Sequence, residues 1–243
     1  MKRKLSILVA MLFVFAMNAQ TFGVKAGMTK SGYKVNFNVP EGANMGEGFH
    51  IAALAEIPLK EKMNIRLTLM FNQLGSERYL EKEKDLGSGP VLTVMDFKKE
   101  VNYIQFSVTP KFKFGKAHAF IGPYAGYAVS AVFSGDYKAG DKVLFEADNI
   151  DLFGSNVQAG EKDDYYNKFD FGMNLGIGYT YNNFFAEISA GMGVLNFINT
   201  DSKLYSKEDE NDPDDPTKPM SEDLSQRNIF FGFSIGYMFA PGK

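Results

Sequence analysis

A run of strictly alternating residues, Phe169–Tyr181, places the strongest constraint on what this chain can fold into. Large apolar side chains occupy every odd position of the run, and small or polar side chains occupy every even position. A period of two residues indicates a β-strand with one apolar face and one polar face. Asn182-Asn183 then predicts a two-residue hairpin turn, because asparagine tolerates positive φ. The next segment, Phe184–Leu195, alternates in the same way and reads as the return strand.

Both strands of this hairpin are long for a soluble protein. Strands of soluble proteins have about 5–6 residues, whereas a tilted strand needs about 9–11 residues to cross a bilayer. Six more segments show the same alternation, so the sequence predicts eight strands in all. These segments are Phe22–Thr29, Phe49–Ile57, Asn64–Asn72, Val101–Phe114, Ala119–Ser134 and Asn228–Phe239. Pro110 lacks a backbone donor, and we expect a bulge or a local slip of register there.

The connections between these segments alternate between long and short. The long ones cover residues 30–48, 75–100, 135–167 and 200–226, and the short ones cover residues 58–63, 115–118 and 182–183. Short turns on the periplasmic side and long loops outside are typical of outer-membrane barrels. The predicted fold is therefore all-β: an eight-stranded antiparallel up-and-down transmembrane β-barrel.

Charge placement indicates which face of the strands meets lipid. No apolar-face position carries a charge, and a charge facing lipid at mid-depth costs about 2–4 kcal/mol for Arg or Lys. The charges of the strands all fall on the other face: Lys25, Glu56, Arg66, Lys111, Lys113, Lys168, Asp170 and Glu187. A soluble lipocalin-like carrier is the alternative, with the apolar face inside. Two features favour the membrane: small polar residues on the polar face, and aromatic residues near strand ends, among them Tyr124 and Tyr127.

The first nineteen residues have the pattern of a secretory signal peptide. Basic residues at positions 2–4 precede an apolar run from Leu5 to Met17, which is shorter than the ~20 residues of a membrane helix. We expect cleavage after Ala19, which leaves residues 20–243 as one barrel domain exported to the outer membrane. The chain has no cysteine and a formal charge of −3, which falls to −6 without the leader. An acidic balance argues against a nucleic-acid partner.

Several segments resemble the PorT-like outer-membrane β-barrel family of Bacteroidetes. They are FGVKAGMT (22–29), YIQFSVTPKFKFG (103–115), AFIGPYAGY (119–127), FDFGMNLGIGYTY (169–181) and FFGFSIGYMF (230–239). The resemblance implies an eight-stranded barrel in the outer membrane, and some members of that family are linked to protein secretion and gliding. The chain departs from the usual barrel ending, because residues 240–243 follow the last aromatic residue, Phe239.

Few residues in the chain suggest chemistry. His50 is expected in the lumen and His118 at a periplasmic turn, and neither completes a catalytic, cofactor-binding or metal-binding constellation. We therefore expect no enzymatic activity, no cofactor and no metal. An outer-leaflet lipid-modifying or protease barrel enzyme is the alternative. The barrel interior is just wide enough for side chains to fill.

The charged residues of the lumen and of one outer loop suggest two further features. Buried charges need partners, so the sequence predicts one network among Lys25, Glu56, Arg66, Lys111 and Glu187. Residues 208–215, EDENDPDD, predict a solvated acidic loop, with a weak calcium site or divalent bridging to lipopolysaccharide as the alternative. The expected partners are outer-membrane lipid and lipopolysaccharide, and a protein bound through the long loops, with no nucleic acid.

Overall fold

The computed structural model describes residues 21–35, 43–85, 90–140, 142–153, 167–197 and 226–239. The predicted signal peptide (residues 1–19), the acidic loop (208–215) and the last four residues lie outside these ranges. Within them, no helix is both long enough and apolar enough to cross a membrane.

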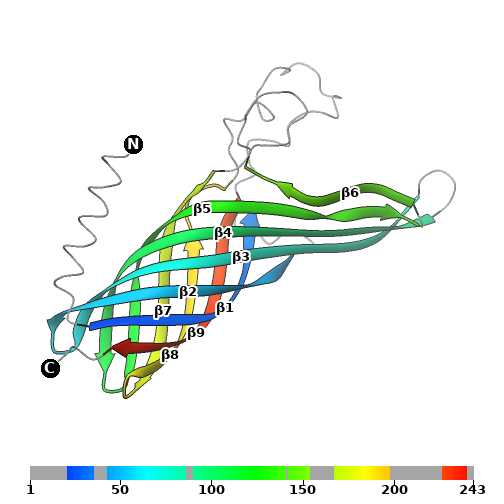
Figure 1. Ribbon diagram of the computed structural model, residues 1–243. Helices are drawn as coiled ribbons and strands as arrows, with labels where there is room; N and C mark the ends of the chain where they lie inside the picture. Colours follow the sequence, from blue (N-terminus) through cyan, green and yellow to red (C-terminus); the bar gives the residue numbers. More distant parts are fainter. Residues whose placement is uncertain are drawn as a thin grey trace, which may run out of the picture.

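Nine strands make up the described part of the chain, and they form one antiparallel sheet. Eight strands close into a ring in the order β4-β3-β2-β1-β9-β8-β7-β5, with β5 pairing back to β4, whereas β6 pairs with β5 alone (Figure 1). The strands are β1 (Thr21–Val35), β2 (Ala43–Lys60), β3 (Met63–Asp85), β4 (Pro90–Phe114), β5 (Ala117–Ala139), β6 (Lys142–Asp151), β7 (Phe169–Tyr181), β8 (Phe184–Gly193) and β9 (Gln226–Phe239).

The all-β barrel class is confirmed, while the strand count and several strand lengths differ from the prediction. Residues 75–100 and 135–167, expected as loops, contain the far halves of β3 and β4, the end of β5 and all of β6. The β3–β4 ladder runs without a register shift from Met63↔Phe112 to Asp85↔Pro90. Charged residues on one face give the far part of this ladder the composition of a loop. For this reason the sequence pattern did not predict strands there.

Three two-residue connections join strands at one end of the ring: residues 61–62, 115–116 and 182–183. Gly115 (φ 66°) and Asn182 (φ 54°) take the positive φ values that such turns require. At Pro110 the register of β3 and β4 is kept by Ile65↔Pro110, so no bulge lies on that side. On the other side the β4–β5 ladder is interrupted between Ser107↔Tyr124 and Lys111↔Phe120, and its register is the same before and after the gap. The register of β4 and β5 shifts instead between Asn102 and Tyr103.

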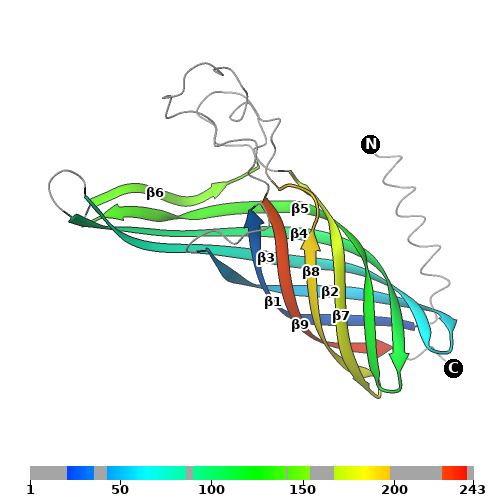
Figure 2. The ribbon, with the colours of Figure 1, turned by 180° about the vertical axis from the view of Figure 1, so that it is seen from behind.

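Apolar side chains cover the outside of the ring. Phe169 and Ile177 on β7 are 67% and 63% exposed, whereas Ser234 and Glu187, on the inner wall, are 0% and 1% exposed. A lipocalin-like carrier needs the opposite arrangement, so this burial pattern contradicts that alternative. The inner wall carries most of the buried polar side chains, so the ring of strands, shown from behind in Figure 2, encloses a polar lumen.

Three buried phenylalanines of the inner face lie inside the lumen, packed along its wall. Each ring lies against a glycine of a neighbouring strand, where a Cβ atom would collide with the ring. The pairs are Phe120 with Gly176, Phe185 with Gly236, and Phe230 with Gly191. Glycines on the polar face therefore make room for aromatic rings inside a narrow barrel.

Beyond the ring, β3, β4 and β5 continue together and β6 joins their edge (Figures 1 and 2). We call this four-stranded projection, formed by residues 77–83, 91–100, 132–139 and 142–151, the extension. It projects from the end of the ring opposite the three short turns, and its inner face continues the inner wall of the barrel.

Candidate functional site

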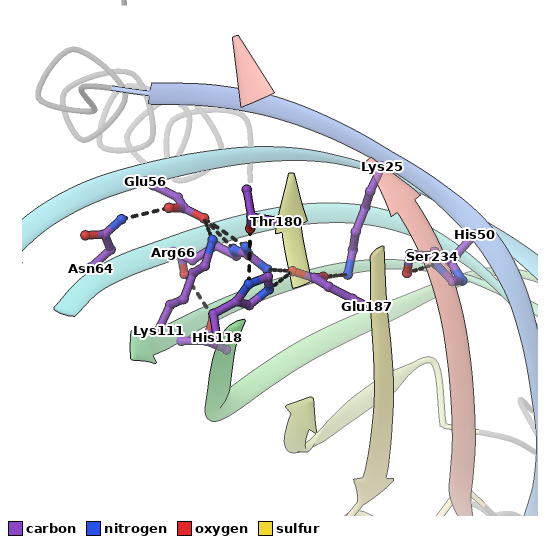
Figure 3. A network of polar contacts seen from close by, with 11 residues as sticks. Lys25, His50, Glu56, Asn64, Arg66, Lys111, His118, Thr180, Glu187 and Ser234 are labelled. Atoms are coloured by element: carbon purple, nitrogen blue, oxygen red, sulfur yellow. Dashed lines mark hydrogen bonds and ion pairs between the residues drawn. The ribbon is translucent and has the colours of Figure 1, made fainter. Parts of the chain in front are cut away.

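A charged network fills the lumen near the short turns, and Glu187 of β8 lies at its centre (Figure 3). Lys25 Nζ donates a hydrogen bond to Glu187 Oε2 at 3.2 Å. Arg66 Nη1 donates to Glu187 Oε1, and His118 Nε2 lies 2.8 Å from the same oxygen. One carboxylate therefore joins side chains from β1, β3 and β5 across the lumen.

Glu56 of β2 forms the second centre of the network. Its Oε1 accepts hydrogen bonds from Arg66 Nε at 2.9 Å and from Lys111 Nζ at 2.8 Å, and its Oε2 accepts one from Asn64 Nδ2 at 2.7 Å. The five residues expected from the sequence are thus brought together. His118, expected in the turn, lies on β5 as a buried member of the network, because the turn ends at Lys116.

Arg66 links the two carboxylates and is almost fully buried. Its guanidinium also lies over two rings, 5.4 Å from the centroid of Phe120 and 5.6 Å from that of Phe185. Burial of a charge is tolerated when it is paired and hydrogen-bonded, whereas loss of one partner typically costs 3–5 kcal/mol. The network therefore cross-links opposite walls of the barrel.

A second polar group, centred on His50 of β2, occupies the middle of the lumen. His50 Nδ1 lies 2.8 Å from Thr29 Oγ1, and His50 Nε2 lies 2.8 Å from Ser234 Oγ. Thr29 donates to Asn72 Oδ1 at 3.0 Å, and Asn72 donates to Gln105 Oε1 at 3.1 Å. The serine–histidine pair was not found from the sequence, since 184 positions separate its members and only closure of the ring brings β2 near β9.

The serine–histidine contact resembles the core of a hydrolase triad, but it is enclosed. Ser234 is 0% exposed and His50 is 4% exposed. The cavity beside His50 measures about 30 Å³, and Lys25, Arg66 and Phe230 help to line it. A volume of this size holds about two water molecules, which leaves no room for a lipid or peptide substrate.

Towards the extension, a third polar group spans the lumen. Asp170 Oδ2 accepts hydrogen bonds from Tyr124 Oη and Asn228 Nδ2, both at 3.0 Å, and Asn228 Nδ2 also donates to Tyr103 Oη at 3.1 Å. Tyr124 was expected in an aromatic girdle facing lipid. It is instead 2% exposed inside the lumen, because it shares a face with Gly122 and Gly126 rather than with Tyr127.

An apolar plug closes the mouth of the ring above Asp170. It consists of Leu74, Val101, Tyr103, Tyr124, Ala128, Ala131, Phe197 and Phe230, with Leu152 and Phe153 packed against it. Lys99 lies beside the plug, beyond the lipid-facing belt, with Nζ 4.6 Å from the Phe197 ring and 4.7 Å from the Tyr33 ring. Burial lowers the pKa of Lys99 to about 8. The described lumen is therefore filled from the charged network to the plug.

Histidines and carboxylates are scattered in the described part of the chain. In those ranges, no three or more His, Asp or Glu side chains gather in a way that could hold a metal ion. The side chains of the possible calcium site, residues 208–215, lie outside the described ranges.

A lipid-facing apolar belt around a filled polar lumen defines the class of protein: a membrane-spanning β-barrel. Residues 18–199 match the model of a family described as outer membrane protein beta-barrel domain, and the chain belongs to that family. The family places the protein in the outer membrane. No curated protein matches the chain.

Solved structures of outer-membrane barrels are similar to this chain at low sequence identity. Neisserial surface protein A is 12% identical with a TM-score of 0.46, covering 90% of this chain and 97% of its own. Ail, the attachment invasion locus protein of Yersinia pestis, is 13% identical with a TM-score of 0.40, and the match covers 91% of this chain and 99% of Ail. OprG of Pseudomonas aeruginosa is 12% identical with a TM-score of 0.37, and the match covers 91% of this chain and 97% of OprG.

Proposed function

We propose that this protein is a non-enzymatic outer-membrane barrel that anchors and displays the extension at the cell surface for interaction with a partner. The belt contacts outer-membrane lipid and lipopolysaccharide, and the extension carries the interaction. The PorT-like resemblance is compatible with an envelope or secretion-associated role for this display.

The filled lumen is the observation that carries this proposal. Three polar groups, three phenylalanine rings and an apolar plug occupy the described lumen, and the cavity left near His50 measures about 30 Å³. A pore or an internal substrate site needs open volume, and eight strands leave little. Among the described residues, the surfaces left for function are the outer ones, and the extension is the part of them that continues beyond the lipid-facing belt.

A barrel hydrolase is the second candidate, because Ser234 Oγ lies 2.8 Å from His50 Nε2. An activated serine must reach its substrate and have donors for the developing oxyanion. Ser234 instead lies on the inner wall at 0% exposure. We assign the pair to barrel packing: the histidine ties β1, β2 and β9 together.

Activity-based labelling tests this assignment. We expect the purified, folded barrel to show no reaction with a fluorophosphonate probe and no hydrolysis of p-nitrophenyl esters. The Ser234→Ala variant should behave identically. Labelling of the native protein that disappears in Ser234→Ala would replace the non-enzymatic proposal with the hydrolase.

Display at the surface is tested with single cysteines, which the cysteine-free chain makes unambiguous. Cysteine at Leu144, on β6, should react with a membrane-impermeant maleimide on intact cells. Cysteine at Lys60, next to a short turn, should react only after the outer membrane is broken. The reverse pattern would invert the barrel and remove the proposed display.

A further inference from the structure

The two faces of the extension differ in chemistry. Positions of β3, β4 and β5 that continue the outside of the barrel carry six carboxylates, and β6 adds two more. These carboxylates are Glu77, Glu81, Glu83, Asp96, Glu100, Asp136, Glu146 and Asp151, with Lys98, Lys138, Tyr79, Leu92, Val94 and Val132 among them. The two lysines are engaged locally, Lys98 with Glu100 at 2.7 Å and Lys138 with Asp136 at 2.6 Å. We call this side the acidic face.

The opposite side, which continues the inner wall of the barrel, is aromatic and cationic. We call it the aromatic face. It carries Leu80, Met95, Phe97, Phe133, Tyr137 and Phe145, with Arg78, Lys82 and Lys99, and no carboxylate of β3, β4 or β5. The Phe97 ring lies between those of Phe133 and Phe145, at centroid distances of 5.2 and 6.2 Å. It packs on Gly135 (φ 143°), where a side chain would collide with it.

Inside the ring, the opposite wall covers the inner face. On the extension, Phe197 and Tyr33 cover Lys99 at the near end of the aromatic face, and no described segment covers the rest of it. Phe145 is exposed there, and the other apolar side chains of the face are half-buried against one another. Four strands about 4.8 Å apart and some six residues long at 3.3 Å per residue give this face roughly 400 Å². The apolar part of the face is smaller, because Arg78, Lys82 and Lys99 also lie on it. The largest apolar patch of a typical monomer measures about 300–600 Å² and is often functional. A hollow of about 210 Å³ lies on this part of the extension, lined by Leu80, Lys82, Glu83, Thr93, Met95 and Tyr137.

Charge on the aromatic face indicates the chemistry of its partner. Arg78 and Lys82 on β3 form a cationic stripe beside the aromatic rings of β4, β5 and β6. Arg78 Nε is buried and has no hydrogen-bond partner among the described residues. An unpaired buried donor costs about 1–3 kcal/mol, and an incoming carboxylate would satisfy it.

A polypeptide fits this surface better than a polysaccharide does. Sugar hydroxyls need hydrogen-bonding partners, and apart from Arg78, Lys82, Lys99 and Tyr137 the face offers mainly Phe, Met and Leu. The hydroxyl of Thr93 on this face already donates to the carbonyl of Lys82 at 2.7 Å. An amphipathic helix, about 10 Å wide with its side chains, can lay an apolar stripe on the rings and an acidic stripe along β3.

We propose that the aromatic face of the extension docks an acidic amphipathic polypeptide segment of a partner protein. The inference rests on the proposed display function and identifies the surface that is displayed. The apolar stripe of the segment packs on Phe97, Phe133 and Phe145, and its carboxylates pair with Arg78 and Lys82. A face of this area is below the standard size of about 800 Å² per partner, so we expect micromolar, salt-sensitive binding.

The test uses the full chain in phosphatidylcholine nanodiscs, with empty nanodiscs as background. The probe is a fluorescein-labelled 18-residue synthetic helix with Leu at i, i+3, i+4 and i+7 and Glu beside this stripe; a second peptide carries Lys for Glu. Fluorescence anisotropy should show micromolar binding of the Glu peptide and at least tenfold weaker binding of the Lys peptide.

Paired variants locate the site. Arg78→Glu with Lys82→Glu should weaken binding at least tenfold, whereas Lys98→Glu with Lys138→Glu, the same charge change on the acidic face, should leave it within twofold. Phe145→Gln should weaken binding several-fold, and Tyr79→Gln should not, although these side chains are 47% and 48% exposed.

Four results would overturn the proposal. The Glu peptide could fail to bind protein that is folded, as shown by heat-modifiability, or the two double charge variants could lose the same binding affinity. The Glu and Lys peptides could also bind equally well, or the barrel could self-associate in place of binding peptide. Dextran sulfate that binds independently of Phe145 while the Glu peptide does not bind would assign the face to a polyanion. Each of these leaves surface display standing, because the maleimide experiment tests display separately.

Discussion

The membrane-spanning and extension parts of the same strands have opposite polarity. On β3, the outward side chain at Leu69 is 51% exposed to lipid, while the outward residue twelve positions on is Glu81. The inward positions change in the other sense on β4, from Ser107 and Gln105 to Phe97 and Met95. The alternation of inward and outward side chains continues without interruption from one part to the other. The same sheet therefore runs through both parts, and the surrounding medium, lipid or water, determines which of its faces is apolar.

The change of polarity is sharp on both strands. Along β4 the outward residues are apolar up to Ile104 and polar from Asn102 to Asp96, and along β3 they change between Phe71 and Gln73. A charge in lipid costs about 2–4 kcal/mol, whereas an exposed carboxylate in water costs little. Matched substitutions in the two parts should therefore have very different effects.

The largest difference is expected between a buried glutamate, Glu187, and an exposed one, Glu146. Glu187→Leu leaves Lys25 and Arg66 buried with one carboxylate fewer, and it should lower the free energy of unfolding by about 3–5 kcal/mol. Glu146→Leu, on the acidic face of the extension, should change it by less than about 0.5 kcal/mol. Heat-modifiability on gels and thermal unfolding in detergent measure both. Similar behaviour of the two variants would mean that the luminal network does not stabilise the barrel.

A smaller difference is expected between two outward positions of β3. Leu69→Arg places a cation in the lipid-facing belt and should cost about 2–4 kcal/mol, with a lower yield of folded barrel in vesicles. Tyr79→Arg makes the same charge change on the same face ten residues further on, at similar exposure. It should fold like the native chain, and a comparable loss of yield at Tyr79 would place the extension in lipid.

The smallest effect is expected in ion conduction. The native barrel should show no stable openings of porin size in planar bilayers, because its described lumen is filled. Phe197→Ala thins the plug but leaves the charged network in place, so it should also show none. Reproducible large conductance of the native protein would contradict the filled lumen.

Alternation, connection lengths and charge placement predicted the barrel class, the apolar face of the strands and the members of the luminal network. Glu56 and Arg66, two of those members, pair directly across β2 and β3. These features follow from local periodicity and from the cost of unpaired charge, both of which are readable in a single sequence.

The extension and the His50 group could not be read in the same way. Residues 77–83 and 91–100 carry their carboxylates on the outward face and Leu80, Met95 and Phe97 on the inward face, the reverse of a lipid-facing strand. A search for lipid-facing strands therefore reads them as a loop. His50 and Ser234 meet only because the ring closes between β1 and β9. His118 was misplaced because a turn two residues shorter than expected puts it on the inner wall of β5.

The central claim, that the outward face of each long strand passes from lipid to water at one level, can be measured along β4. Single nitroxide labels at Phe112, Val108, Ile104, Asn102, Lys98 and Asp96 of the cysteine-free chain report collisions with oxygen, which concentrates in lipid, and with a water-soluble nickel complex. The account predicts oxygen-dominated collisions up to Ile104 and nickel-dominated collisions from Asn102 onward. Lipid-like values continuing to Asp96, or water-like values at Val108, would contradict it.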